Sequence, residues 1–291
     1  MVSLIVCTLA RTEPLRFLLK SLDQQTYRNF EVLIVDQNSD ERLLPVLAGH
    51  PELPIRHLRS YRGLSRARNV GLKYANGDIV AFPDDDCWYP RDLLESVTHW
   101  FSAHREFAGL FVRLRDSEGN AIGPKLPDDA CRCTKQNILT VGASPAGFLR
   151  RDLVDAIGPF NENIGAGANT PYQAGEECDY FLRALDGRNM WYDPALTVHH
   201  PQLHSLERLR RTTYSYALGS AYVLRIHACH RYYWRLVVRS LGGAVATLCR
   251  LDFANSYIYL LRAAGFLRGY FWGPRDLAKL SRSKVQVSQP I

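Results

Sequence analysis

The sequence has no long apolar run, no cysteine pair with C-x-x-C spacing and no glycine-rich loop after its first apolar segment. Its 7 cysteines are scattered over 291 residues without a C-x-x-C pair, so neither a disulfide framework nor a zinc site is indicated. Reduced thiols in a cytoplasmic protein are expected. The apolar run after Met1 is short and has no basic residue before it. It therefore predicts a first strand and not a signal peptide.

Acidic residues are scarce in the last third of the chain. Residues 205–291 contain 14 Lys/Arg and 3 Asp/Glu, a net charge of +11, whereas the remainder has a net charge of −4. This region is also aromatic, as in RYYWRL, SYIYLL and GYFWG. A basic, aromatic region indicates contact with an anionic surface, either a membrane or nucleic acid. Its longest apolar run, Leu241–Leu248, lies between Arg239 and Arg250, so a membrane contact would be peripheral and not spanning.

Strand and helix signals alternate up to about residue 115. Strands are predicted at 2–8, 30–35, 55–59 and 78–82, and helical spacing separates them. This alternation predicts an α/β fold with a mostly parallel sheet and helices on both faces. Ligands of such sheets bind outside the carboxyl ends of the strands. Asp36 and the run Asp84–Asp86 follow predicted strands, so we expect them at that edge.

The pattern is looser from Cys131 to Pro201. AGFLR predicts a strand, RDLVDAIG a helix and residues 161–175 a glycine-rich loop. A helix containing GEECDYFLRAL and a short WYDPALTVHHP segment follow. All of the chain beyond Ser205 has helical spacing.

Three adjacent carboxylates end the fourth predicted strand, in DIVAFPDDDCWY. Residues two apart on an extended chain point the same way, so Asp84 and Asp86 can face one ligand while Asp85 turns aside. Two such oxygen donors can hold Mg²⁺ or Mn²⁺, with phosphates as further ligands. A solvated acidic turn before a helix is the alternative interpretation. The attachment of the run to a buried strand favours the metal site.

These motifs together resemble one family. SLIVCTLAR, LLKSLDQQTYRNFEVLIVDQNSD and GLSRARNVGLKYANGDIVAFPDDD, followed by FNENIG, GEECDYFLRAL and DPALTVHHP, resemble the inverting glycosyltransferases of family 2. The resemblance covers roughly residues 1–201 and implies the Rossmann-like GT-A fold. It implies a GT-A domain at 1–204, with a nucleotide-sugar-binding half at 1–115 and an acceptor and catalytic-base half at 116–204. Residues 205–291 would form a helical, basic and aromatic extension.

The resemblance assigns the donor-binding residues by position. Asp84 and Asp86 match the family's D-x-D motif, which holds a divalent ion on the diphosphate of a sugar nucleotide. Asp36 matches the aspartate that recognises the nucleobase. Thr8 falls where base and ribose are contacted, and Arg68 matches a basic residue near the phosphates.

A second group of carboxylates matches the family's catalytic base. The GEECDY segment aligns with an E-D motif whose second carboxylate takes the acceptor proton, and that position is Glu177, where the family has aspartate. Because glutamate reaches further, Glu176 or Asp179 could share or take the role. An acidic first helical turn is the alternative interpretation. His200 matches a histidine that joins the metal or diphosphate site in some relatives, and Asp85 would at most contact the sugar.

These assignments predict a metal-dependent inverting glycosyltransferase with Mn²⁺ or Mg²⁺ as cofactor. The expected donor is a nucleoside diphosphate sugar, with UDP preferred, and the expected acceptor is a glycan or lipid-linked molecule of polysaccharide or glycoconjugate biosynthesis. A metal and Arg68 would stabilise charge on the leaving group, and one base would give a single displacement. Peripheral contact with the inner face of a membrane is expected from the basic extension. Nucleic acid is not an expected partner, because no recognition motif is present.

Two other classes of function are weighed against this one. A sugar-nucleotide pyrophosphorylase shares the α/β layout but needs a glycine-rich phosphate loop after the first strand, and CTLARTEPL has no glycine. A non-catalytic nucleotide-sugar-binding or scaffold protein of the same fold is opposed by carboxylates at all three expected positions. UDP binding without donor hydrolysis or transfer would favour it.

Overall fold

The computed structural model describes residues 1–122, 126–201 and 206–272. The chain divides into two compact units, of which the first comprises Met1–Asn161 and Glu176–Leu203 and the second Glu162–Gly175 and His204–Ile291. The helical prediction for residues 273–291 lies outside the described residues.

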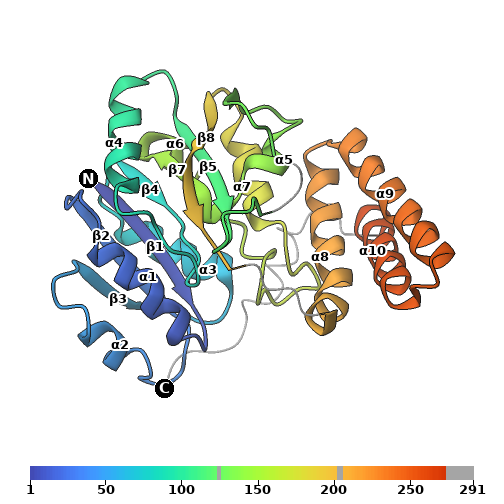
Figure 1. Ribbon diagram of the computed structural model, residues 1–291, viewed down its shortest axis with the longest axis horizontal. Helices are drawn as coiled ribbons and strands as arrows, with labels where there is room; N and C mark the ends of the chain where they lie inside the picture. The colour runs from blue at the N-terminus through green and yellow to red at the C-terminus, as the bar shows by residue number, and fades with distance from the viewer. Residues whose placement is uncertain (123–125, 202–205, 273–291) are drawn as a thin grey trace, which may run out of the picture. The chain divides into compact units, whose positions relative to one another are not determined.

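The first unit is built on one mixed sheet of eight strands in the order β3-β2-β1-β4-β7-β5-β8-β6 (Figure 1). The strands are β1 Val2–Thr8, β2 Phe30–Asp36, β3 Ile55–Arg59, β4 Ile79–Ala81, β5 Gly109–Arg115, β6 Cys131–Arg132, β7 Gly147–Arg150 and β8 Met190–His199. The four N-terminal strands are parallel to one another. β7 lies antiparallel to its neighbours β4 and β5.

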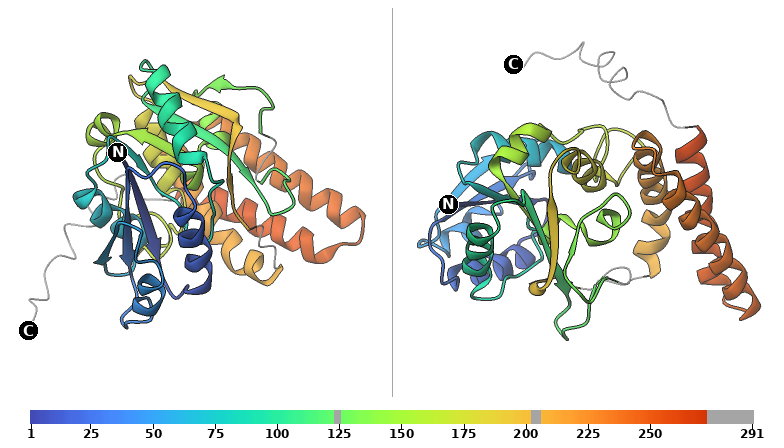
Figure 2. Two further views of the ribbon diagram at one scale, coloured as in Figure 1. Left: turned by 60° about the vertical axis from the view of Figure 1, so that its left-hand side comes forward. Right: turned by 90° about the horizontal axis from the view of Figure 1, so that it is seen from above.

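Helices cover both faces of this sheet (Figure 2). They are α1 Glu13–Asp23, α2 Leu44–Ala48, α3 Leu64–Tyr74, α4 Leu93–Ala103, α5 Ile138–Val141, α6 Arg151–Ile157 and α7 Glu176–Ala184. Alternation along β1 decides the faces, because Leu4 and Val6 join the cluster of buried apolar residues on α1 and α4. Ile5 points to the opposite face and meets Gly71 of α3, where a Cβ atom would overlap its side chain. The predicted α/β class is confirmed.

The strand register brings three segments to one edge of the sheet. Thr8 at the end of β1 pairs with Asp36 at the end of β2. Cys7 pairs with Asp84 in an isolated parallel bridge just beyond β4. Parallel pairing thus places Thr8, Asp36 and the Asp84–Asp86 run together at the carboxyl edge, as expected for ligand binding in such sheets.

The sequence does not predict three strands of the sheet in full. β5 and β6 have no predicted element, and β8 is predicted only as a short segment. The register between β5 and β8 shifts between Val112 and Arg113, from a partner at Asp193 to one at Thr197. The intervening residues bulge out of the ladder and accommodate Pro194, which cannot donate a ladder hydrogen bond. Because proline is rare inside strands, the sequence does not predict the full ten-residue length of β8.

The second unit contains three long helices, α8 Leu206–Ile226, α9 His230–Cys249 and α10 Phe253–Phe271 (Figure 1). Glycines let α10 lie close to α8, since a Cβ atom at Gly265 or Gly269 would overlap backbone carbonyl groups of Tyr214 or Leu218. Residues 162–175 pack on the same unit, where the rings of Tyr172 and Tyr222 lie 4.8 Å apart. None of the described helices combines the length and apolar content needed to cross a membrane.

Candidate active site at the carboxyl edge of the sheet

Asp84, Asp86 and His200 form a three-residue group with potential ligand atoms within 4.8 Å of one another. His200 directly follows β8, and its Nε2 lies 3.1 Å from Asp86 Oδ1 and 3.6 Å from Asp84 Oδ2. Asp86 Oδ1 is buried, and no described residue gives it a hydrogen bond of normal geometry. Two carboxylates and an imidazole suit a divalent cation such as Mn²⁺. A buried carboxylate oxygen beside an imidazole nitrogen therefore fits a shared metal site.

The negative charge of Asp84 and Asp86 raises the pKa of His200. Burial would lower the pKa of His200, but the neighbouring carboxylates of Asp84 and Asp86 raise it to about 10. The pKa of Asp86 is lowered, because His200 and Arg11 together outweigh the opposing effect of burial. Without a metal the group is thus an acidic pair balanced by an imidazolium and a guanidinium. A divalent cation bound by this group would displace the proton of His200 and supply positive charge in its place.

Arg11 ties the middle of the acidic run to the loop after β1. Its Nη1 donates to Asp85 Oδ1 at 2.9 Å and to Asp86 Oδ2 at 2.7 Å. Asp85 is buried, and burial raises its pKa to about 6 although Thr8 and Arg11 oppose the rise. Asp85 therefore turns toward Arg11 and Thr8 and not toward His200. The sequence pattern gives little indication of Arg11 beyond its place in the loop that follows the first strand.

Arg68 of α3 connects the acidic run with α7. The side chain is buried, and its Nη2 donates to Ser144 Oγ at 2.8 Å and lies 3.9 Å from Asp84 Oδ1. Its Nη1 lies 3.5 Å from Glu176 Oε1. One guanidinium thus stands between the two carboxylate groups that the sequence singled out separately.

The three candidate bases on α7 have different surroundings. Burial raises the pKa of Glu176 to about 7, an effect that Arg68 opposes and Glu177 strengthens. Glu177 is half-buried, and its Oε2 accepts a hydrogen bond from the backbone N–H of Ser144 at 2.9 Å. Asp179 is buried and forms an ion pair with Arg183 at 3.0 Å. Because successive helical residues differ in direction by 100°, one helix turn distributes the three carboxylates among different partners.

Asp36 is fully enclosed at the end of β2. Its Oδ1 accepts hydrogen bonds from the backbone and side chain of Asn38, at 2.8 and 2.7 Å. Its Oδ2 lies 2.8 Å from Arg59 Nη1 and 3.0 Å from His57 Nε2. Arg59 and His57 are partly exposed, and neither is among the residues predicted for the site. Because they are two residues apart on β3, their side chains point to the same face, beside the end of β2. Thr8 is buried at the adjoining strand end.

The edge defined by these side chains is where ligands bind in α/β proteins with parallel strands. The family model of glycosyl transferase family 2 matches residues 3–158, slightly more than half of the chain. The chain therefore belongs to glycosyl transferase family 2.

One curated relative and two solved structures extend the comparison. An uncharacterized glycosyltransferase, YwdF of Bacillus subtilis, is 36% identical over 169 residues, which are 56% of this chain and 63% of the relative. The chain thus spans less than two thirds of the length of that relative. The structure of S. aureus TarS 1-349 in complex with UDP-GlcNAc is similar with a TM-score of 0.64 and 18% identity, over 98% of this chain and 76% of that 1-349 chain.

The second solved structure is the mannosyltransferase PcManGT from Pyrobaculum calidifontis in complex with GDP-Man and Mn²⁺. It is similar with a TM-score of 0.59 and 16% identity, over 94% of this chain and 88% of PcManGT. Both structural likenesses concern the fold alone, and they confirm the GT-A fold.

Proposed function

We propose that the protein is a metal-dependent inverting glycosyltransferase that uses a nucleoside diphosphate sugar. The observation that carries the proposal is the position of Arg68, between the Asp84, Asp86 and His200 group and the carboxylates of α7. A metal and phosphate site beside a proton acceptor is what sugar transfer to a hydroxyl requires. This arrangement also disfavours the non-catalytic alternative.

On the donor side, Asp84, Asp86 and His200 would hold Mn²⁺ or Mg²⁺. When bound, the ion would neutralise charge on the diphosphate leaving group. Arg68 would add a second positive charge near the phosphates. Arg11 would hold Asp86 in place through the hydrogen bond at 2.7 Å. Asp85, which is paired with Arg11, would act by positioning and not by binding the metal.

On the acceptor side, Glu177 would take the proton from the attacking hydroxyl. The hydrogen bond from Ser144 N–H to its Oε2 orients the carboxylate, and Oε1 would accept the proton. Glu176 is less suited to this role, because its carboxylate is buried and lies 3.5 Å from Arg68 Nη1. Asp179 is already engaged by Arg183. A carboxylate acting opposite the leaving group gives inversion at the anomeric carbon.

We infer UDP as the donor nucleotide, with Asp36, Thr8, His57 and Arg59 near the base. The likeness to a structure with UDP-GlcNAc supports this choice, and the likeness to one with GDP-Man makes the donor a question for experiment. The proposed acceptor is a glycan or a lipid-linked molecule in glycoconjugate biosynthesis. The proposed catalytic domain is 1–204, with a basic extension at 205–291 that meets the inner face of a membrane.

A thermal-shift screen tests the donor and the metal together, because ligands of the native state raise its melting temperature. UDP, GDP and dTDP would each be measured with and without Mn²⁺. We expect a shift with UDP that requires the metal. A larger shift with GDP or dTDP would change the donor, and the absence of any nucleotide shift would contradict the proposed function.

A further inference from the structure

Exposed apolar side chains follow one side of α9 at alternating intervals of four and three residues. Such spacing places residues on a single helix face. The stripe consists of Trp234, Val238, Leu241, Val245 and Leu248, all of them exposed. A different face of α9, which includes Tyr233, Val237, Ser240 and Ala244, is the buried one. The stripe is therefore additional to the face that packs within the helical unit.

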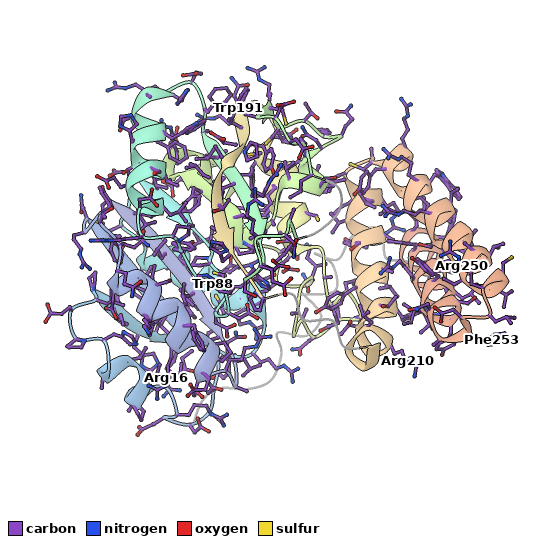
Figure 3. The ribbon with its side chains drawn as sticks, in the orientation of Figure 1. Arg16, Trp88, Trp191, Arg210, Arg250 and Phe253 are labelled. Atoms are coloured by element: carbon purple, nitrogen blue, oxygen red, sulfur yellow. The ribbon has the colours of Figure 1, made fainter. Side chains whose placement is uncertain are left out.

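A second exposed stripe lies on α10 and on the turn before it. It consists of Leu251, Phe253, Tyr257, Leu260, Phe271 and Trp272, and Figure 3 marks the turn between the helices by Arg250 and Phe253. The two stripes adjoin at their other end, where the ring centroids of Trp234 and Phe271 are 6.3 Å apart. Both stripes together are called the hairpin face. An apolar surface of this extent marks an interaction site.

The charges beside the hairpin face are almost all positive. Arg231, Arg235 and Arg239 are exposed and recur every four residues, so they flank the α9 stripe on the side away from the buried face of the helix, with Arg231 nearest to the stripe. Arg250 is exposed at the turn. From His230 to Phe271 the single carboxylate is Asp252, and it caps α10 by accepting hydrogen bonds from Asn255. The arginines therefore have no acidic residue of this hairpin with which to pair.

We propose that the hairpin face docks on the surface of an anionic lipid bilayer. An apolar stripe with aromatic residues and a cationic edge is the composition of helices that lie at the headgroup level. Anionic headgroups complement the arginines, and the acyl region accepts the apolar side chains. The inference deepens the proposed function and rests on it for its biological setting, since a lipid-linked acceptor is reached from such a surface.

A second copy of the chain fits this face less well. Two hairpin faces packed together would bring arginine edges to each other without acidic partners. Nucleic acid would satisfy the arginines but leave the apolar stripe in water. An anionic bilayer is the one of these three partners that complements both parts of the surface.

Vesicle flotation of the full chain tests the proposal. We expect the protein to float with vesicles of phosphatidylcholine mixed with phosphatidylglycerol, and much less with phosphatidylcholine alone. The paired change Leu241→Ser and Val245→Ser should abolish the binding that survives high salt, because apolar contact is not screened. Leu44→Ser, a change at an exposed leucine of α2, is the matched control and should float like the wild type.

A charge series tests the arginine edge separately. The triple change Arg231→Gln, Arg235→Gln and Arg239→Gln should lower the partition coefficient on the anionic vesicles on the order of 100-fold. The control is the triple change Arg28→Gln, Arg91→Gln and Arg105→Gln at exposed arginines of the first unit. It changes the net charge equally and should lower the partition coefficient much less. Equal losses in both triple variants would overturn the proposed edge, because only net charge would then matter.

Two further results would overturn the lipid proposal. One is a wild type that gives the UDP thermal shift but does not float with anionic vesicles, which would leave the proposed function standing. The other is a wild type that does not bind vesicles but is a dimer in light scattering. If the Leu241→Ser and Val245→Ser variant were then a monomer, the hairpin face would be an interface with a second copy of the chain. Flotation without any nucleotide shift would instead support docking and contradict the glycosyltransferase proposal.

Discussion

Arg68 Nη1 lies 3.5 Å from Glu176 Oε1, and both side chains are buried. The other terminal nitrogen of Arg68 donates to Ser144 Oγ, and the backbone N–H of the same serine holds Glu177. Ser144 thus connects the arginine near the metal group to the proposed base. This connection makes the roles of the carboxylates on α7 separable by experiment.

Replacing Glu176 by Gln should remove a pH-dependent loss of stability. Burial raises the pKa of Glu176 from 4.5 to about 7. Between these pH values the folded protein keeps a proton that the unfolded chain releases. The free energy of unfolding therefore falls as the pH rises through 7, by roughly 3 kcal/mol at most. Urea unfolding from pH 4 to 8.5, without metal, would measure it; parallel curves for wild type and variant would contradict the prediction.

Glu177→Gln should abolish transfer and leave donor binding intact. The amide oxygen can still accept the hydrogen bond from Ser144, but the side chain cannot take a proton. We expect kcat to fall about 10²–10⁴-fold, with an unchanged UDP thermal shift. Asp179→Asn is the comparison, because it weakens the ion pair with Arg183 and should act mainly on stability. A kcat loss in Asp179→Asn larger than in Glu177→Gln would move the base to Asp179.

Changing Asp86 to Asn should remove the metal-dependent part of the UDP thermal shift. The substitution takes away a buried anionic ligand whose Oδ1 lies 3.1 Å from His200. His200→Ala should weaken the response to Mn²⁺ about 10- to 100-fold, as expected for a change within a metal site. Asp78→Asn, at an exposed carboxylate before β4, is the control. An unchanged Mn²⁺ response in Asp86→Asn would rule out the metal site as described.

Asp36→Ala should reduce both stability and UDP binding. It removes the partner of Arg59, His57 and Asn38, and we expect the free energy of unfolding to fall by about 1–3 kcal/mol. Arg59→Gln is the separating variant, because Arg59 is half-exposed and contributes less to the folded state. A reduced UDP shift with near-normal stability in Arg59→Gln would support base contact through Arg59. A normal UDP thermal shift in both variants would show that Asp36 and Arg59 do not contribute to UDP binding.

The bounds of β1 and β3 agree with the sequence prediction because they depend on local spacing of apolar residues. The length of β8 is not predicted, because it depends on pairing with a distant strand. Pro194 is typical of a strand end, and only the pairing with β5 across a bulge makes the whole segment a strand. A sequence window does not contain that partner. The same limit applies to Arg11, whose two carboxylate partners lie more than 70 residues away along the chain.

By itself the sequence determined the α/β class and the family, because strand and helix periodicity and the ordered motifs are local properties of the chain. It also predicted that Thr8 ends a strand and that Asp36 and the Asp84–Asp86 run follow strands. Tertiary structure alone decided which side chains meet there: Arg11 beside Asp85, His200 beside Asp86, and Arg68 beside Glu176. The physical reason is that ion pairing and burial act through space, so the charge of each carboxylate depends on elements that only folding brings together.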